Sequence, residues 1–220
     1  MKTLYIIRHG QTEWNVARRM QGRLDSALTP LGQQQAIQHG QTLKALGGVE
    51  HLYVSPAGRT QETAYLLNSF LGSAMTFDEA LLERDCGVWS GMTEDEIAER
   101  FPREWETRNE DPVAFRPPGG ETISDLIGRV EGFLDDLFGA PEATIGLVTH
   151  GVMSRAILTR LLSLSKQMTG LVRHPNDLFY RLEFEPTELR AAYFLGGDGP
   201  HQGLLTEAPE RADAGQQQPE

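Results

Sequence analysis

Short apolar runs alternate with longer segments of mixed polarity, and this alternation is the main pattern along the chain. Apolar and β-branched residues at 3–7, 51–55 and 144–149 predict buried strands, and residues 75–77 predict a shorter one. A chain in which strands alternate with helices folds as an α/β protein. We therefore expect a three-layer α/β/α sandwich with a mainly parallel sheet.

Capping residues indicate where the helices begin and end. Thr29 is a candidate N-cap, Pro30 suits the first helical position, and Gly47-Gly48 ends the same helix. The other predicted helices are 58–70, 93–101 (which Pro102 ends), 122–138, and one that begins at or just after His150-Gly151.

The remaining segments differ from this pattern. Residues 179–184 and 190–194 predict two strands whose short connection implies an antiparallel pair at the sheet edge. Residues 103–120 are rich in proline and glycine and contain Trp105 and Phe115, which indicates a lid-like insertion rather than a regular core element. Residues 196–199 predict an ordinary turn.

Length and composition favour one domain. A chain of 220 residues that is 39% hydrophobic can bury a full core, so we expect residues 1–205 to form a single domain with an insertion at about 102–120. Residues 206–220 are polar and predict a disordered tail.

Charge narrows the set of partners. A formal net charge of −11 disfavours binding to nucleic acid or to an anionic membrane. No apolar run approaches the roughly 20 residues of a membrane span, and no apolar leader follows Met1, so we expect a cytoplasmic protein. The single cysteine, Cys86, fits a reducing compartment. Residues 1–23 nevertheless carry five basic residues against one acid, which makes a local anion site plausible there.

Three polar residues stand at the carboxyl ends of predicted strands. His9 ends the first strand, Ser55 the second and His150 the strand at 144–149. Because ligands of α/β sheets bind beyond the carboxyl ends of the strands, we expect these residues to meet at one edge.

The segment Arg8-His9-Gly10, followed by residues 11–15, resembles the signature of the histidine phosphatase (phosphoglycerate mutase-like) superfamily. Three further blocks resemble the same family in the same order: the second arginine motif at 55–64, the acid loop at 82–91, and His150 with Gly151. Residues 21–29 resemble its substrate-side loop. Together these blocks span about residues 1–165.

The resemblance implies a phosphate-transfer site. His9 is the expected nucleophile, because an unprotonated imidazole attacks phosphorus and then leaves readily. Glu83 is the expected general acid and base. The catalytic residues that the resemblance implies are His9, Glu83 and His150, and a protonated His150 would stabilise charge in the transition state. The phosphate- or substrate-binding residues that it implies are Arg8, Asn15, Gln21, Gly22, Arg59 and Gly151.

Structural alternatives exist for several of these residues. Asn15 also fits a turn-forming residue, and Arg59 also fits an ordinary surface arginine. Glu83 also fits a partner of Arg84 or Arg59 in an ion pair, and His150 also fits a helix cap. No His-x-His, His-Glu-x-x-His or carboxylate cluster occurs, so we expect no metal and no cofactor.

Three functions compete: a phosphatase acting on a small phosphorylated metabolite, a cofactor-dependent phosphoglycerate mutase, and a non-catalytic binding module. The intact set of site residues disfavours the binding module. Mutases of the family usually carry a lysine and paired arginines after the acid loop, whereas this chain has Glu94 and no arginine pair. We therefore expect an acidic pocket there and favour the phosphatase. The substrate and the oligomeric state, a homodimer included, stay open.

Overall fold

The computed structural model describes residues 2–206. Its strands are β1 Lys2–Arg8, β2 His51–Val54, β3 Ala74–Phe77, β4 Thr144–Thr149, β5 Leu178–Phe184, β6 Leu189–Leu195 and β7 Asp198–Gln202. Its helices are α1 Glu13–Val16, α2 Pro30–Ala45, α3 Gly58–Leu71, α4 Glu94–Arg100, α5 Pro102–Glu110, α6 Ile123–Gly139, α7 Gly151–Leu162 and α8 Lys166–Leu171.

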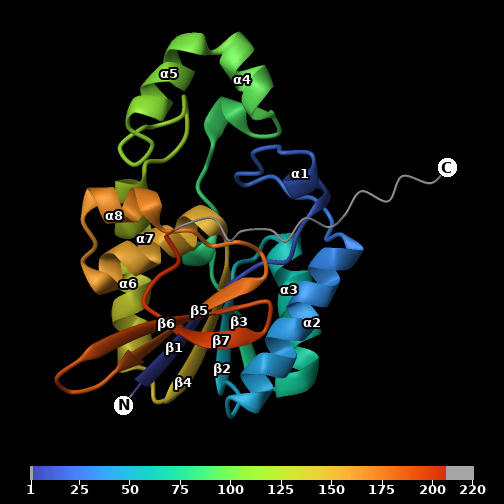
Figure 1. The fold of residues 1–220 in the computed structure, drawn as a ribbon, viewed down its shortest axis with the longest axis vertical. Coiled ribbons are helices and arrows are strands. Elements are labelled where there is room, and N and C mark those ends of the chain that lie inside the picture. The colour runs from blue at the N-terminus through green and yellow to red at the C-terminus, as the bar shows by residue number, and fades with distance from the viewer. Residues whose placement is uncertain (1, 207–220) are drawn as a thin grey trace.

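One seven-stranded sheet forms the centre, in the order β3-β2-β4-β1-β5-β6-β7. The strands β3, β2, β4 and β1 are parallel, and β5, β6 and β7 add an antiparallel edge. Helices cover both faces, as Figure 1 shows, with α2 and α3 on one side and α6 and α7 on the other. The predicted α/β sandwich with an antiparallel edge is confirmed.

Side chains of β1 alternate between the two faces, as a strand requires. Leu4 and Ile6 pack in the core that includes α6 and α7. Tyr5 and Ile7 pack in the core that includes α2 and α3. Burial on both sides therefore fixes the register of the first strand, because a slip of one residue would exchange the two cores.

Several elements differ from the prediction. Pro102 does end α4, but it also occupies the first turn of α5, a position that proline favours, so part of the predicted irregular insertion is helical. Only Gly196 and Gly197 of the predicted turn form a turn; Asp198 and Gly199 already belong to β7, which also contains Pro200. Proline is tolerated at a sheet edge, which is where β7 lies. Helices α1 and α8 are short and have no counterpart in the prediction. The predicted tail, apart from Thr206, lies outside the described residues.

The insertion and the preceding helix α4 together form a lid above the sheet, with α4 and α5 at its top (Figure 1). Its core is Trp89, which is fully buried, stacks on Phe115 and contacts Trp105 edge-on. Both aromatic residues of the insertion are thus packing anchors. The acid loop lies directly against the insertion, because a Cβ added to Gly87 would stand 2.0 Å from the carbonyl oxygen of Pro118.

Close packing of α2 on α3 at Gly40 yields a test of the fold. A Cβ at this buried glycine would lie 2.6 Å from the carbonyl oxygen of Leu67. Gly40→Ala should therefore lower the free energy of unfolding by about 1–3 kcal/mol through overpacking, as measured by urea denaturation. Gly128→Ala is the matched control, because this helical glycine is exposed and a Cβ added to it would meet no other atom within 4 Å. Its higher helix propensity should raise stability by roughly 0.5–1 kcal/mol. Equal effects of the two substitutions would contradict the packing.

Candidate active site

Backbone pairing between β1 and β4 brings the two histidines together. Arg8 pairs with Thr149 in parallel register, and the His9 amide donates to the carbonyl of Thr149 at 3.0 Å. The next residue on each strand, His9 and His150, therefore stands at the same edge, with ring centroids 5.3 Å apart. The Ser55 amide donates to the Val148 carbonyl, which places Ser55 beside them.

His9 is held in an orientation suited to nucleophilic attack. Its Nδ1 lies 2.8 Å from the carbonyl oxygen of Gly10, which can only accept, so Nδ1 carries the proton and Nε2 holds the free lone pair. The ring is 3% exposed. Burial, together with Arg8 and Arg59, lowers the pKa of His9 well below its usual 6.5. The imidazole is thus neutral at pH 7.

His150 is fully buried behind this site, and its Nε2 lies 2.7 Å from the Ser55 hydroxyl. Its Nδ1 has no hydrogen-bond partner among residues 2–206. Burial, with Arg59 and His9 adding to it, lowers the pKa of His150 well below its usual range. His150 is therefore neutral in the free protein, whereas the sequence argument considered a protonated ring that acts in the transition state. Two cationic arginines near a buried imidazole make a third positive charge too costly.

Arg59 is 1% exposed, so it is not a surface arginine. Its guanidinium donates to the carbonyls of Leu24 and Gly22 and to Asp25, at 2.6, 3.0 and 2.9 Å. These bonds tie the loop after α1 to the first turn of α3. The Nε of Arg59 has no partner.

Arg8 donates to the carbonyl of His174, while its Nε has no partner. Burial lowers the pKa of Arg8 to about 10, with Glu83 opposing the shift, so the guanidinium stays charged. Asn15 accepts from the Thr12 amide through Oδ1, which leaves its side-chain nitrogen free to donate elsewhere. Asn176, which the sequence did not single out, donates to the His9 carbonyl at 2.8 Å and so fixes that backbone.

Glu83 caps α7. Its carboxylate accepts from the amides of Val152 and Met153, at 3.1 and 3.0 Å, and from the Arg84 amide at 2.8 Å. The positive end of the helix dipole stabilises a carboxylate in this position. Two amides of the first turn are therefore bound to Glu83 and do not face a phosphate. Gly151 also packs against the guanidinium of Arg8, where an added Cβ would meet it at 3.2 Å.

These side chains meet around one cavity of about 190 Å³. Among its lining residues are Arg8, His9, Asn15, Gln21, Gly22, Arg59 and Glu83, all predicted for the site. His150 lies behind the wall, and Gly151 lines an adjoining hollow. The cavity wall also contains Arg108, a pocket candidate of the insertion, and Arg84 and Arg155, which the sequence argument did not place there. Glu94 does not line it; this residue is exposed and lies 3.7 Å from Arg108, so the expected acidic pocket is wrong.

Comparison with known proteins identifies the family. The family model of the histidine phosphatase superfamily (branch 1) matches residues 4–194. The chain belongs to the histidine phosphatase superfamily. A probable phosphoglycerate mutase, GpmB, of Salmonella paratyphi B is 33% identical over 208 residues, which cover 91% of this chain and 95% of that one.

Solved structures of histidine phosphatase relatives have the same fold. YhfR of Bacillus stearothermophilus is 30% identical with a TM-score of 0.80, over 90% of this chain and 98% of that one. The mycobacterial glucosyl-3-phosphoglycerate phosphatase Rv2419c, solved with VO3, is 30% identical with a TM-score of 0.75, over 83% and 91% of the two chains.

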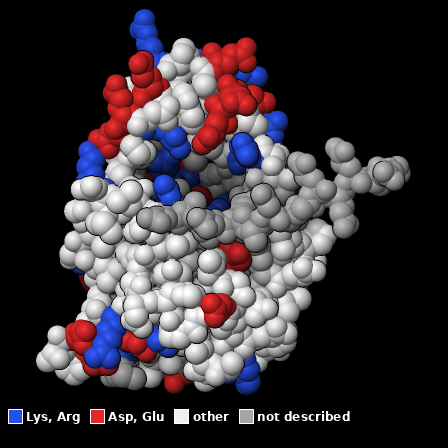
Figure 2. Space-filling model, in the orientation of Figure 1, with Lys and Arg blue, Asp and Glu red and all other residues white. Residues whose placement is uncertain are grey.

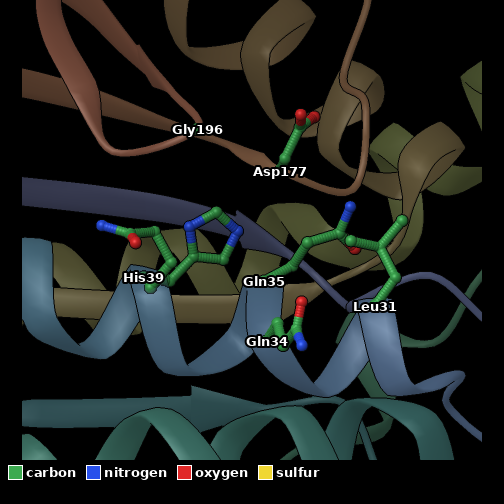
Figure 3. Close-up of a pocket in the computed structure, with 7 residues that line it drawn as sticks. Leu31, Gln34, Gln35, His39, Asp177 and Gly196 are labelled. Atoms are coloured by element: carbon green, nitrogen blue, oxygen red, sulfur yellow. The ribbon is translucent and has the colours of Figure 1, made fainter. Parts of the chain in front are cut away.

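A separate cavity of about 240 Å³ lies between α2 and the segments that carry Asp177 and Gly196 (Figure 3). Leu31, Gln34, Gln35 and His39 of α2 contribute to its wall. None of the predicted site residues is among those that line it. Within residues 2–206 no three His, Cys, Asp or Glu side chains are grouped to hold a metal, and no helix there is long and apolar enough to cross a membrane.

Buried histidines make the stability of the protein depend on pH. The pKa values of His9, His39, His150 and His174 are all lowered by burial, that of His39 to about 4. Below pH 6.5 the unfolded chain therefore binds more protons than the folded one. The stability present above pH 6.5 should fall by about 1.4 kcal/mol per pH unit for each histidine as the pH drops towards the folded pKa values.

Urea unfolding at pH 7.5, 6.5 and 5.5 measures this slope. His39→Gln, which keeps a donor for the Asn176 carbonyl that His39 contacts at 3.2 Å, should reduce the slope by one proton. Titration of the ring of His9, His39, His150 or His174 near pH 6.5 in the folded state, observed by NMR, would contradict the burial argument.

Proposed function

We propose that this histidine phosphatase hydrolyses a small phosphomonoester through a phosphohistidine on His9. The observation that carries the proposal is the bond from Nδ1 of His9 to the Gly10 carbonyl, which leaves Nε2 unprotonated in a cavity with Arg8, Arg59 and Glu83. A nucleophile, two cations and one carboxyl group are the parts that two-step phosphoryl transfer needs.

In the first step, Nε2 of His9 attacks the phosphorus and the ester P–O bond breaks. Protonated Glu83 gives its proton to the departing alcohol oxygen. Positive charge develops on the ring as the N–P bond forms, and the Gly10 carbonyl that accepts from Nδ1 stabilises it. Arg8 and Arg59 neutralise charge on the phosphoryl oxygens, and their partnerless Nε groups supply donors. Neutral His150 can donate from Nδ1 when Ser55 donates to its Nε2.

In the second step, Glu83 removes a proton from water, the water oxygen attacks phosphorus and the N–P bond breaks. The products are inorganic phosphate, neutral His9 and protonated Glu83, so the site returns to its starting state. Neither step needs a metal or a cofactor, because guanidinium groups supply the positive charge.

A phosphoglycerate mutase is the second candidate. Arg84, Arg108 and Arg155, which also line the cavity, are suited to retaining an anionic product while it reorients. These arginines favour a mutase more strongly than the sequence did. The phosphatase stays the main proposal because hydrolysis requires only the groups already described. We place the enzyme in the cytoplasm, since Cys86 is a free buried thiol and the net charge disfavours nucleic acid and membrane partners.

His9→Ala should reduce turnover by about a thousandfold or more, because no other histidine is among the residues that line the cavity. Labelled substrate, quenched in alkali, should leave an acid-labile phosphoryl group on the wild-type chain and none on the variant. His201→Ala, at a half-exposed histidine on β7, is the control and should keep full activity. Normal turnover in His9→Ala would end the proposal.

Glu83→Gln should slow substrates with poor leaving groups far more than p-nitrophenyl phosphate, whose alcohol departs without a proton. The expected difference is about 10²-fold or more in kcat/KM. Because Gln can accept fewer of the α7 amides, circular dichroism must show that the variant is folded. Equal losses on both kinds of substrate would remove Glu83 as the general acid.

Following phosphate release and the conversion of 3- to 2-phosphoglycerate on one preparation separates the two candidates. We expect phosphomonoester hydrolysis with little mutase activity, even when 2,3-bisphosphoglycerate is supplied. Conversion that exceeds phosphate release by orders of magnitude would favour the mutase instead.

A further inference from the structure

A second hollow, of about 250 Å³, adjoins the His9 cavity on the side away from the phosphate-binding pair Arg8 and Arg59. It is lined by Arg84, Arg108, Asn109, Pro112, Arg155, Gly170 and Arg173. Arg84, Arg108 and Arg155 line both spaces, so the two share a wall of arginines. Figure 2 shows basic side chains gathered inside the hollow below the lid, while acidic side chains lie on the outer surface above it.

These four arginines come from different parts of the fold. Arg84 belongs to the acid loop, Arg108 to α5 of the lid and Arg155 to α7, while Arg173 follows α8. No single sequence motif contains them. The fold therefore concentrates four positive charges at one place in a chain whose net charge is −11.

Their charges are poorly balanced by the protein. Of the four, only Arg108 takes part in an ion pair among residues 2–206, with Glu94 at 3.7 Å. Arg84 is 8% exposed, and its Nε has no hydrogen-bond partner. Burial lowers the pKa of Arg155; Glu83 opposes this shift, and Arg84, Arg173 and Arg108 add to it. Arg84 is buried, Arg108 and Arg155 are half-buried, and Arg173 is exposed at the rim. Like charges gathered in a partly enclosed hollow repel one another, and an anionic ligand would relieve this repulsion.

We propose that these four arginines form a subsite for a second phosphoryl group of the substrate, so that the enzyme acts on a small bisphosphorylated metabolite. The proposal rests on the proposed function. One phosphoryl group would lie at His9 between Arg8 and Arg59, and the other in the second hollow. A phosphoryl group has three peripheral oxygens for several guanidinium forks, whereas a carboxylate has two and is satisfied by one fork. Four guanidinium groups therefore fit a phosphate better than a carboxylate.

Binding measurements on a catalytically silent protein test this subsite without depending on turnover. In a His9→Ala background, isothermal titration calorimetry would compare glucose 6-phosphate, 6-phosphogluconate and glucose 1,6-bisphosphate, which differ at carbon 1. Glycerol 3-phosphate, 3-phosphoglycerate and glycerol 1,3-bisphosphate form a second, three-carbon series. On at least one skeleton the bisphosphate should bind tenfold or more tightly than the monophosphate and the carboxylate.

Arg155→Gln and Arg173→Gln should each remove most of the preference for the bisphosphate. Arg160→Gln is the matched control, because this exposed arginine lies on the same helix, α7, and pairs with Glu131 instead. It should leave the preference unchanged.

A second phosphate that fails to tighten binding on either skeleton would overturn the proposal. So would a preference for the carboxylate, or a preference for the bisphosphate that survives both substitutions. Since binding is measured apart from catalysis, these results stand whether the wild-type protein proves to be a phosphatase or not. If the wild-type protein transfers no phosphoryl group, the proposed function is refuted but the subsite is not.

Discussion

Hydrogen bonds between β1 and β4 determine where the reactive groups lie. The parallel register that pairs Arg8 with Thr149 brings His9 and His150 out of the sheet side by side. The same sheet edge places Ser55 beside them through its bond to Val148. Since both strands are buried on two faces, this register cannot slip without disrupting both cores. The position of the nucleophile therefore follows from core packing.

Positive charge is the second constraint. Arg8 and Arg59 lie beside two buried imidazoles, and the result is a pair of neutral histidines rather than a larger cation. Glu83 is the only carboxylate among the residues that line the cavity, and the first turn of α7 holds it through two amides. Acid–base chemistry and helix capping thus depend on the same side chain.

The sequence predicted those features that depend on local pattern. The apolar strands, the cap at Thr29, and the residues at the end of each strand could be read because strand and helix signals are local. Helix α5 was missed because Pro102 can end one helix and begin the next.

The wider cavity could not be predicted in this way. Arg84, Arg108 and Arg155 meet only through tertiary contacts, and no spacing in the sequence reveals that they do. Glu94 misled the sequence argument for the same reason, because its position after the acid loop gives no information on where its side chain lies. The neutral state of His150 likewise depends on burial that the sequence does not display.

The hydrogen bond from Nδ1 of His9 to the carbonyl of the following residue also determines which ring nitrogen can be phosphorylated. A histidine has two nitrogens, and phosphorylation yields one of two regioisomers that differ in lability and in the antibodies that recognise them. Here the backbone of Gly10 occupies one nitrogen, so the proposed intermediate forms only on the other. The chain would carry a single regioisomer, chosen by a main-chain carbonyl that no side-chain substitution can remove.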